Sequence, residues 1–465
     1  MHILWGLVGM IGLLAIAVSA STNRRAISLR TVLPALGLQI GFGVLVLFVP
    51  AGRSVLNGAA KGVQAVIDSS KTGIGFLFGS LITEKGFVFA FQVLPVIVFF
   101  ASLTSVLYYL GLLQRFVEGL GSALEKVLGT ERAESVNAAA NIFLGQTEAP
   151  LLIRPYLSGM TRSGLFAVMV GGLSTVAGSV LVGYALLGAN LDYLIAASFM
   201  AAPGALLMAK IVVPEDGTID SEVKARRTWP RWLGGRAATA EAAEKVETVA
   251  KVEATSEKTV TATEPANKVT ATATDAAPTS ATATATAAPD TEEPEHRNVI
   301  DAAAAGAADG LKLALNIGAM LLAFISLIAL LNLILGAIGG LFGHGDLTFQ
   351  TLLGYVFAPV MAMIGVPLDE AVRAGSFVGQ KIVVNEFVAF SEFGPVVASF
   401  TPKTAAIVTF ALTGFANLSS LGILLGGLGS MAPNKRGEIA HLGMRAVLAA
   451  TLANLMSATI AGMVL

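Results

Sequence analysis

The chain has 465 residues, of which 54% are hydrophobic, 13% are charged and 50 are glycine, and its net charge is −1. Soluble domains carry about 25% charged residues, whereas membrane helices tolerate glycine well. This composition predicts a helical membrane protein and excludes a basic nucleic-acid-binding protein. The absence of cysteine excludes disulfides, thiol catalysis and Cys-ligated metal sites.

Eight apolar runs are long enough, at about 20 residues each, to cross a bilayer. They fall near residues 3–20, 32–51, 87–112, 164–187, 190–212, 309–341, 404–430 and 442–464. Two more apolar stretches, 131–158 and 370–400, are broken by polar and charged residues. Because irregular backbone is tolerated at membrane depth only where protein or water satisfies it, we expect two re-entrant hairpins there.

The first apolar run, from Ile3 to Ala20, loosely resembles a signal peptide. Signal peptides place positive charge before the apolar run, but here Arg24, Arg25 and Arg30 follow it and no Lys or Arg precedes it. We therefore expect an uncleaved first helix whose N-terminus lies outside the cell.

Basic residues in the short connections predict the orientation in the cell (inner) membrane. The stretches 21–31, 113–134 and 431–441 carry Lys and Arg and are expected to be cytoplasmic. With eight spans and both termini outside the cell, these three stretches are all cytoplasmic only if each hairpin enters and leaves the membrane on the same side. The prediction is an all-α polytopic membrane protein of eight transmembrane helices and two oppositely oriented re-entrant hairpins, arranged as an inverted repeat.

This plan divides the chain into three parts. Residues 1–212 hold spans one to five with the first hairpin, and residues 301–465 hold spans six to eight with the second. Between them, residues 213–300 contain 10 of the 30 basic and 15 of the 31 acidic residues, with Thr-Ala tracts. Such a segment buries too little apolar surface to fold, which predicts a disordered cytoplasmic loop.

Two carboxylates lie inside the broken stretches, Glu148 in the segment from Gly145 to Pro150 and Glu386 directly after Asn385. A charge at membrane depth costs roughly 2.5–3.5 kcal/mol, so its presence favours solute or ion handling. The alternative for Glu148 is a capped hairpin turn that includes Gln146 and Thr147. For Glu386 the alternative is an ion pair with Lys381, although we expect Lys381 and Arg154 to extend toward polar edges.

A Gly/Ser/Thr-rich segment follows each carboxylate by about thirty residues. In the first, Thr175 together with Asn141 offers oxygens to a cation. In the second, Asn417 and Ser420 are three residues apart and share a helical face, close to Phe415. The alternative for both segments is close helix packing by small residues.

The polar groups of this pathway are two carboxylates, two amides and two hydroxyls, without an arginine cluster. Phosphate or carboxylate substrates call for cationic donors or bidentate arginine. The set therefore favours a neutral solute rich in hydroxyls and ring nitrogens.

Several motifs resemble the concentrative nucleoside transporter family in its short bacterial form, over essentially the whole chain except 213–300. They are Val106-Leu107-Tyr108-Tyr109-Leu110-Gly111, Gly145-Gln146-Thr147-Glu148, Lys381-Ile382-Val383-Val384-Asn385-Glu386-Phe387-Val388-Ala389 and Gly414-Phe415-Ala416-Asn417-Leu418-Ser419-Ser420. The resemblance implies a homotrimer in which spans one, two and six form a scaffold. Each protomer then moves its own transport domain in elevator-like alternating access.

The resemblance also implies roles for single residues. The nucleobase would meet Gln146, Thr147, Glu148 and Val180, and the ribose would meet Glu386, Asn417 and Ser420, with Phe415 packing nearby. A sodium ion would bind Asn141 and Thr175 through side chains and Leu144 and Val176 through carbonyls. Thr175 stands where Ser is expected and keeps the hydroxyl.

The sequence thus predicts a cation-coupled nucleoside symporter, without an enzymatic activity or a cofactor other than the coupling ion. The bilayer, the nucleoside and two further copies of the chain are its expected partners, and nucleic acid is not. The coupling ion is Na⁺ or H⁺, and the choice between purine and pyrimidine stays open. The alternatives are transport of another neutral polar solute such as a nucleobase or sugar, a passive channel, and an intramembrane hydrolase, against which the four scattered histidines argue.

Overall fold

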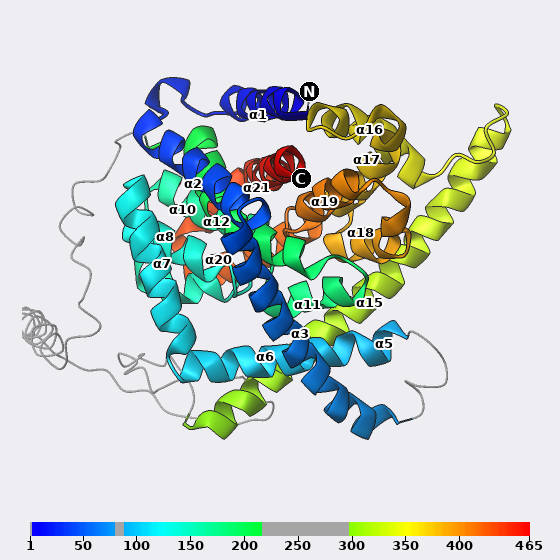
Figure 1. Ribbon diagram of the computed structural model, residues 1–465. Helices are drawn as coiled ribbons and strands as arrows, with labels where there is room; N and C mark the ends of the chain where they lie inside the picture. Colours follow the sequence, from blue (N-terminus) through cyan, green and yellow to red (C-terminus); the bar gives the residue numbers. More distant parts are fainter. Residues whose placement is uncertain (1, 80–87, 216–296) are drawn as a thin grey trace, which may run out of the picture. The chain divides into compact units, whose positions relative to one another are not determined.

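The computed structural model describes residues 2–79, 88–215 and 297–465 (Figure 1). Within these ranges every regular element is a helix. The predicted loop over 213–300 lies almost entirely outside the described residues. The all-helical fold predicted from the composition is confirmed.

The predicted apolar runs fall on helices, although not every helix was predicted. Before the loop they are α1 (His2–Ser19), η1 (Arg24–Ala26), α2 (Leu29–Leu47), α3 (Pro50–Phe78), α5 (Phe89–Gln92), α6 (Leu94–Tyr109), α7 (Leu112–Leu128), α8 (Arg132–Ala140), η2 (Ala149–Ile153), α9 (Arg154–Leu157), α10 (Arg162–Ser174), α11 (Gly178–Leu186) and α12 (Leu191–Val212). After it they are α15 (Val299–Gly340), α16 (Phe349–Met363), α17 (Leu368–Val383), α18 (Glu386–Phe393), η4 (Gly394–Ser399), α19 (Pro402–Leu412), α20 (Leu418–Met431), η5 (Pro433–Lys435) and α21 (Arg436–Val464).

Six helical segments of the described chain are long and apolar enough to cross a membrane, or seven if the bent pair α16–α17 counts as one span. The first and seventh predicted spans fall on the shorter apolar helix α1 and on the interrupted pair α19–α20. The count of eight spans and the re-entrant path of the two hairpins stay predictions.

Three helices, α3, α7 and α16, have no counterpart among the predicted spans and hairpins. α3 alternates apolar residues with exposed Arg53, Lys61 and Lys71, so a search for continuous apolar runs passes over it. Its buried positions, such as Leu56 and Ile67, recur at helical spacing. Amphipathic helices such as α3 and α7 require a periodicity argument, whereas α16 is apolar but too short to be found as a span of about 20 residues.

The order of elements repeats in the two halves of the chain. Each half has a helix–turn–helix segment (α8 to α9, then α17 to η4), a broken helix (α10–α11, then α19–α20) and a long unbroken helix (α12, then α21). α21 packs against α10 and α12 of the first half as well as against α19 and α20 of its own half, so it joins the two halves.

α6 and α15 pack together more extensively than any other helix pair, and Figure 1 shows them crossing. Two glycines four residues apart on α15 make this contact close. A Cβ atom on Gly306 would lie 2.8 Å from the Ala101 carbonyl oxygen, and one on Gly310 would lie 2.8 Å from the Val98 Cα atom. Small residues at this spacing let helix backbones approach in a membrane. In contrast, only 11% of the most apolar stretch of α15 is buried, so most of this helix presents an apolar face outward.

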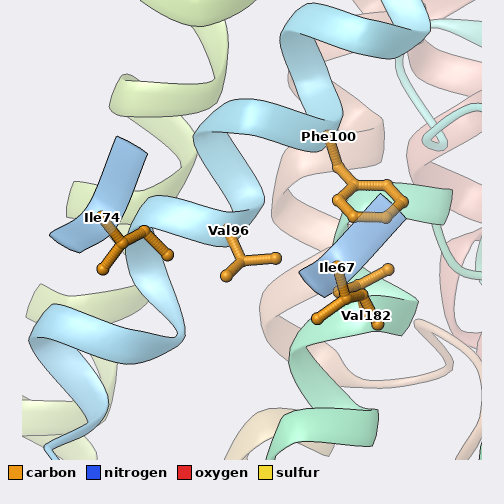
Figure 2. Close-up of a cluster of buried hydrophobic side chains, with 5 residues drawn as sticks. All are labelled: Ile67, Ile74, Val96, Phe100 and Val182. Carbon is orange, nitrogen blue, oxygen red and sulfur yellow. The ribbon is translucent and has the colours of Figure 1, made fainter. Parts of the chain in front are cut away.

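A cluster of buried aliphatic and aromatic side chains joins α3, α6 and α11 (Figure 2). Ile67 and Ile74 come from α3, Val96 and Phe100 from α6, and Val182 from α11. This contact involves the face of α11 opposite to Val180 and Tyr184, because residues two positions apart on a helix point about 200° apart.

Candidate functional site

The two broken helices meet at their breaks. The break between α10 and α11 contains Thr175, and the break between α19 and α20 contains Phe415, whose N–H donates to the Thr175 carbonyl oxygen at 3.2 Å. Gly414 makes this approach available because its φ is +150°. A Cβ atom there would lie 2.7 Å from the Ser174 carbonyl oxygen and in collision with the Asn454 amide. Only glycine fits this close approach without strain.

Glu386 lies at the first position of α18, where the preceding residue caps the helix. Asn385 Oδ1 accepts from the Val388 N–H at 2.9 Å. The Glu386 side chain is 4% exposed. Its Oε1 accepts from the Tyr184 hydroxyl at 2.9 Å, and its Oε2 accepts from Asn417 Nδ2 at 2.6 Å. An ionised carboxylate offers about four lone-pair sites, so these two bonds leave about two for a ligand.

Asn417 is held in the same way at the start of α20. Its Oδ1 accepts from the Ser420 N–H at 2.7 Å and from the Ser419 hydroxyl at 2.8 Å, which leaves its Nδ2 for Glu386. The sequence pattern Asn-x-x-Ser is therefore a helix N-cap. This cap aims the amide at the carboxylate of the other segment.

Tyr184 is the residue of this cluster that the sequence analysis missed. It is fully buried, its ring stacks on Phe390 with centroids 4.4 Å apart, and it meets Phe387 edge-on at 4.8 Å. A signal for it existed, because Tyr184 lies four residues after Val180 and so shares its helical face. Val180 is buried on the same helix.

Glu148 differs from Glu386 in its surroundings. Its side chain is exposed, and its Oε2 accepts one hydrogen bond, from the Gly145 N–H at 3.2 Å. The neighbouring Gln146 is buried, and its Oε1 has no partner in the described chain. The two carboxylates therefore differ: Glu386 is enclosed by protein groups, whereas Glu148 is accessible, and their depth in the membrane stays a prediction.

Two antiparallel helices, α11 and α20, connect these carboxylate segments. On α20, Thr147 packs over Gly427: a Cβ atom built on Gly427 would lie 2.8 Å from Thr147 Cγ2. Asn417 lies ten residues earlier, directly before the first turn of the same helix. On α11, Ala177 just before the helix lies 3.7 Å from a Cβ built on Gly145, whereas Tyr184 reaches Glu386 near the other end. Both helices therefore pass from one segment to the other, α11 over about 10 Å and α20 over about 15 Å at 1.5 Å per residue.

The residues of the predicted sodium site also converge on the first break. α8 packs on α10 at Gly171, where a Cβ atom would lie 3.2 Å from Asn141 Nδ2. Asn141 Nδ2 donates to the Asn137 carbonyl oxygen at 2.9 Å, and the Thr175 hydroxyl donates to the Gly171 carbonyl oxygen at 2.9 Å. Asn141 Oδ1 is buried and has no partner in the described residues.

The two expected carbonyl ligands are next to these side chains in the chain. Leu144 lies in the turn after α8, and Val176 follows Thr175 in the break. The Phe143 carbonyl oxygen accepts from the Gly178 N–H at 2.9 Å, which fastens this turn to the start of α11. A buried amide oxygen without a partner next to backbone carbonyls suits a hard cation, which prefers oxygen ligands.

Lys381 does not extend toward a polar edge, and this expectation was wrong. It is buried, and its ammonium donates to the Ala411 carbonyl oxygen at 2.7 Å and to Asn454 Oδ1 at 2.8 Å. Arg154 is exposed, as expected. Asn454 lies on the last helix, far from any predicted motif, so the sequence analysis had no signal for this contact.

The sequence matches three family descriptions in order along the chain. The N-terminal part of the Na⁺ dependent nucleoside transporter family matches residues 8–81, and its C-terminal part matches residues 193–462. A domain described as Gate, for nucleoside recognition, matches residues 90–191. The chain belongs to the concentrative nucleoside transporter family. The family resemblance seen in the motifs is therefore confirmed, and this nucleoside transporter is a multi-pass membrane protein rather than an enzyme.

Relatives of this transporter extend along its full length. An uncharacterized transporter of Haemophilus influenzae is 48% identical over 100% of this chain and 98% of its own. The nucleoside permease NupC of Helicobacter pylori is 43% identical over 99% and 97%. The rat sodium/nucleoside cotransporter 2 is 33% identical over 98% of this chain and 62% of its own.

A solved structure is similar over the same range. CNTnw in an inward-facing substrate-bound state is 47% identical, covers 100% of this chain and 98% of its own, and superimposes with a TM-score of 0.82. Variants of CNTnw in outward-facing and intermediate states match with TM-scores of 0.80 to 0.83. The transporter thus shares its fold with a protein solved in several conformations.

Proposed function

We propose that this protein carries nucleosides into the cell together with Na⁺, by elevator-like alternating access. The observation that carries the proposal is the position of Glu386. Its carboxylate is bonded by Tyr184 from the first half of the chain and by Asn417 from the second, with lone pairs left over. A carboxylate that is fixed by both halves of the repeat and can still accept hydrogen bonds is suited to bind the vicinal hydroxyls of a ribose.

The nucleobase is expected at the other end of α11 and α20. Gln146 and Thr147 offer an amide and a hydroxyl there, and the exposed Glu148 offers acceptors, so an edge of a heterocycle has both donors and acceptors to meet. Val180 lies on α11 between the two ends and supplies an apolar wall. Phe415 is half-buried in the second break, and its N–H bonds the Thr175 carbonyl oxygen. We place its ring beside the nucleoside.

The cation is expected at Asn141, Leu144, Thr175 and Val176. Thr175 links this site to the substrate site, because its carbonyl oxygen accepts from the Phe415 N–H. Ion binding at the first break would therefore fix the second break, which carries Asn417 and Ser420. One cation moving inward down about 100 mV releases roughly 2.3 kcal/mol, and at 1.4 kcal/mol per tenfold this supports about fifty-fold accumulation.

For the moving and fixed parts we propose a homotrimer in which α1, α2 and α15 form the scaffold. The outward apolar face of α15 offers a surface for neighbouring copies or lipid. The contact of α11 with α3 and α6 is built from aliphatic and aromatic side chains (Figure 2), and such a contact has no directional bonds to break when one side slides. Both termini are proposed to lie outside and residues 213–300 in the cytoplasm.

Uptake of labelled uridine into proteoliposomes tests the proposal, with Na⁺ and H⁺ gradients imposed separately. The expected result is accumulation above equilibrium that requires the inward Na⁺ gradient. Accumulation driven by H⁺ alone would replace the coupling ion, and equilibration without accumulation would identify a channel. Uptake of uracil in preference to uridine would contradict nucleoside transport and favour a nucleobase carrier.

A further inference from the structure

Lys381 is a buried charge in the second half of the molecule that neither proposed site uses. It lies on the last turn of α17 and is 1% exposed. The ion pairs of the described chain do not include it. A charge at membrane depth costs roughly 2.5–3.5 kcal/mol, so a lysine that is kept there without a carboxylate partner needs a function.

The two oxygens that accept from the Lys381 ammonium are neutral, and the Glu386 carboxylate acts on this charge through space without forming an ion pair with it. One is the carbonyl of Ala411 at the C-terminal end of α19, where carbonyls lack helical partners and the helix dipole is negative. The other is the amide oxygen of Asn454. Carbonyl and amide oxygens are also the ligands that hard metal cations prefer, so the surroundings of this ammonium resemble those of a bound ion.

The two breaks are built alike around this point. The Thr175 hydroxyl donates to the carbonyl oxygen of Gly171, four residues earlier, at 2.9 Å, and the Thr413 hydroxyl donates to that of Thr409, also four residues earlier, at 2.7 Å. Over the first break lies Asn141, from the turn that ends α8, with an unpaired oxygen. Over the second break lies Lys381, from the end of α17, with a positive charge.

Asn454 connects the two positions. While its Oδ1 accepts from Lys381, its Nδ2 donates to the Ser174 carbonyl oxygen at 2.7 Å. Ser174 directly precedes Thr175 of the cation site. The Lys381 ammonium at the second break therefore bonds Asn454, and Asn454 in turn bonds the end of α10 at the first break.

We propose that Lys381 is a built-in cation that fills the second break, so that only the first break exchanges an ion. The inference rests on the proposed function for the identity of the exchanging ion. Its own content is that the second break is a cation site whose ion is covalently attached. Lys381 is a positioning residue in this scheme, since it acts on the first break through Asn454.

The test replaces the ammonium by an oxygen ligand and leaves space for an ion, in Lys381→Asn. Nucleoside affinity of the purified protein is measured at a series of subsaturating Na⁺ concentrations. Because linkage is reciprocal, the slope of log affinity against log Na⁺ counts the coupled ions, and we expect about one for the wild type and about two for Lys381→Asn. Lys381→Arg keeps the charge and is expected to keep the wild-type slope. Lys312→Asn, at an exposed lysine of α15, is the control for the substitution itself.

An unchanged slope in Lys381→Asn with nucleoside binding intact would overturn the proposal. If the variant binds no nucleoside, its melting temperature is measured against Na⁺ concentration without substrate. A steeper Na⁺ dependence of the melting temperature than in the wild type supports a new ion site, and an equal or shallower one overturns it. A wild-type slope near zero would contradict Na⁺ coupling, whereas the difference between variant and wild type would still test Lys381.

Discussion

The two halves of this transporter repeat the same elements but treat their buried polar groups differently. In the second half, Glu386, Asn417 and Lys381 are bonded to neighbouring side chains or to backbone groups, although the buried amide of Gln380 beside them has no partner in the described chain. In the first half, Gln146 and Asn141 leave buried oxygens without partners in the described chain. Unpaired buried oxygens cost free energy unless something binds them. The bonded cluster of Glu386, Asn417 and Lys381 is therefore suited to hold a fixed geometry, and the free oxygens of Gln146 and Asn141 are suited to receive ligands.

Neutralising Glu386 should disrupt the bonded cluster of the second half and have the largest effect on nucleoside binding. In Glu386→Gln the new amide can accept from only one of the two donors, Tyr184 and Asn417, and points its own N–H₂ at the other. The ribose hydroxyls, which the proposal places on the remaining lone pairs, would also meet a neutral amide instead of a carboxylate. Losing two such charged hydrogen bonds at about 1.5–3 kcal/mol each predicts a loss of uridine affinity of about 100-fold or more. Binding of labelled uridine to purified protein measures it. Glu392→Gln, at a half-buried position of the same helix, is the matched control, and an equal loss there would contradict the special position of Glu386.

The close contact of the two breaks should be sensitive to a single methyl group. In Gly414→Ala the new Cβ meets the Ser174 carbonyl oxygen and the Asn454 amide at a positive φ. Strain and collision together predict a loss of stability of about 2 kcal/mol or more, seen as a lower melting temperature. Gly422→Ala on α20 meets open space in the described chain and should leave the melting temperature nearly unchanged. Equal melting temperatures for both variants would mean that the breaks do not pack as described.

The first half is tested at its cation site. Thr175→Val removes a hydroxyl without changing the size of the side chain, and the loss of one oxygen ligand or hydrogen bond predicts an approximately tenfold higher half-saturating Na⁺ concentration. Thr413→Val removes the corresponding hydroxyl of the second break and should leave Na⁺ dependence unchanged. Uptake into proteoliposomes at varied Na⁺ measures both variants. A reversed pattern would assign the exchangeable ion to the second half.

The exposed carboxylate should respond less than the buried one. Glu148→Gln keeps an acceptor oxygen for the Gly145 N–H but replaces a charged acceptor by a neutral one, so uridine affinity is expected to fall by roughly three- to tenfold. The same binding assay compares it with Glu386→Gln. A loss as large as that of Glu386→Gln would show that Glu148 becomes buried against the substrate.

The smallest effect is expected from the segment outside both halves. Deletion of residues 240–295 removes sequence whose composition predicts no packed core, so transport should change by less than about twofold. Uptake by the deletion protein is compared with the wild type at equal amounts in the membrane. Loss of transport by correctly inserted protein would contradict this prediction.

The sequence was informative where function requires a local pattern. Glu386 and Asn417 were found because a charge in an apolar run and a pair of polar residues three positions apart on one helical face are visible within a few residues. Tyr184 and Asn454 were not found, because a tyrosine or asparagine in an apolar helix has many explanations until its distant partner is known. Lys381 was assigned wrongly for the same reason, since its acceptors lie 30 and 73 residues away.

The length of α15 has a consequence for the lipid around this transporter. At 1.5 Å per residue its 42 residues extend about 63 Å, roughly twice the hydrocarbon thickness of about 30 Å. The first part of the helix carries Asp301, Asp309 and Lys312 and can lie outside the hydrocarbon. The charge-free residues 313–340 still extend about 42 Å, so an upright helix would leave apolar side chains in water and we expect α15 to lean. Gly306 and Gly310 lock α6 to it, and α6 has to lean as well. The bilayer thereby sets the angle of this pair, which makes the choice of acyl-chain length a control on turnover in reconstituted vesicles.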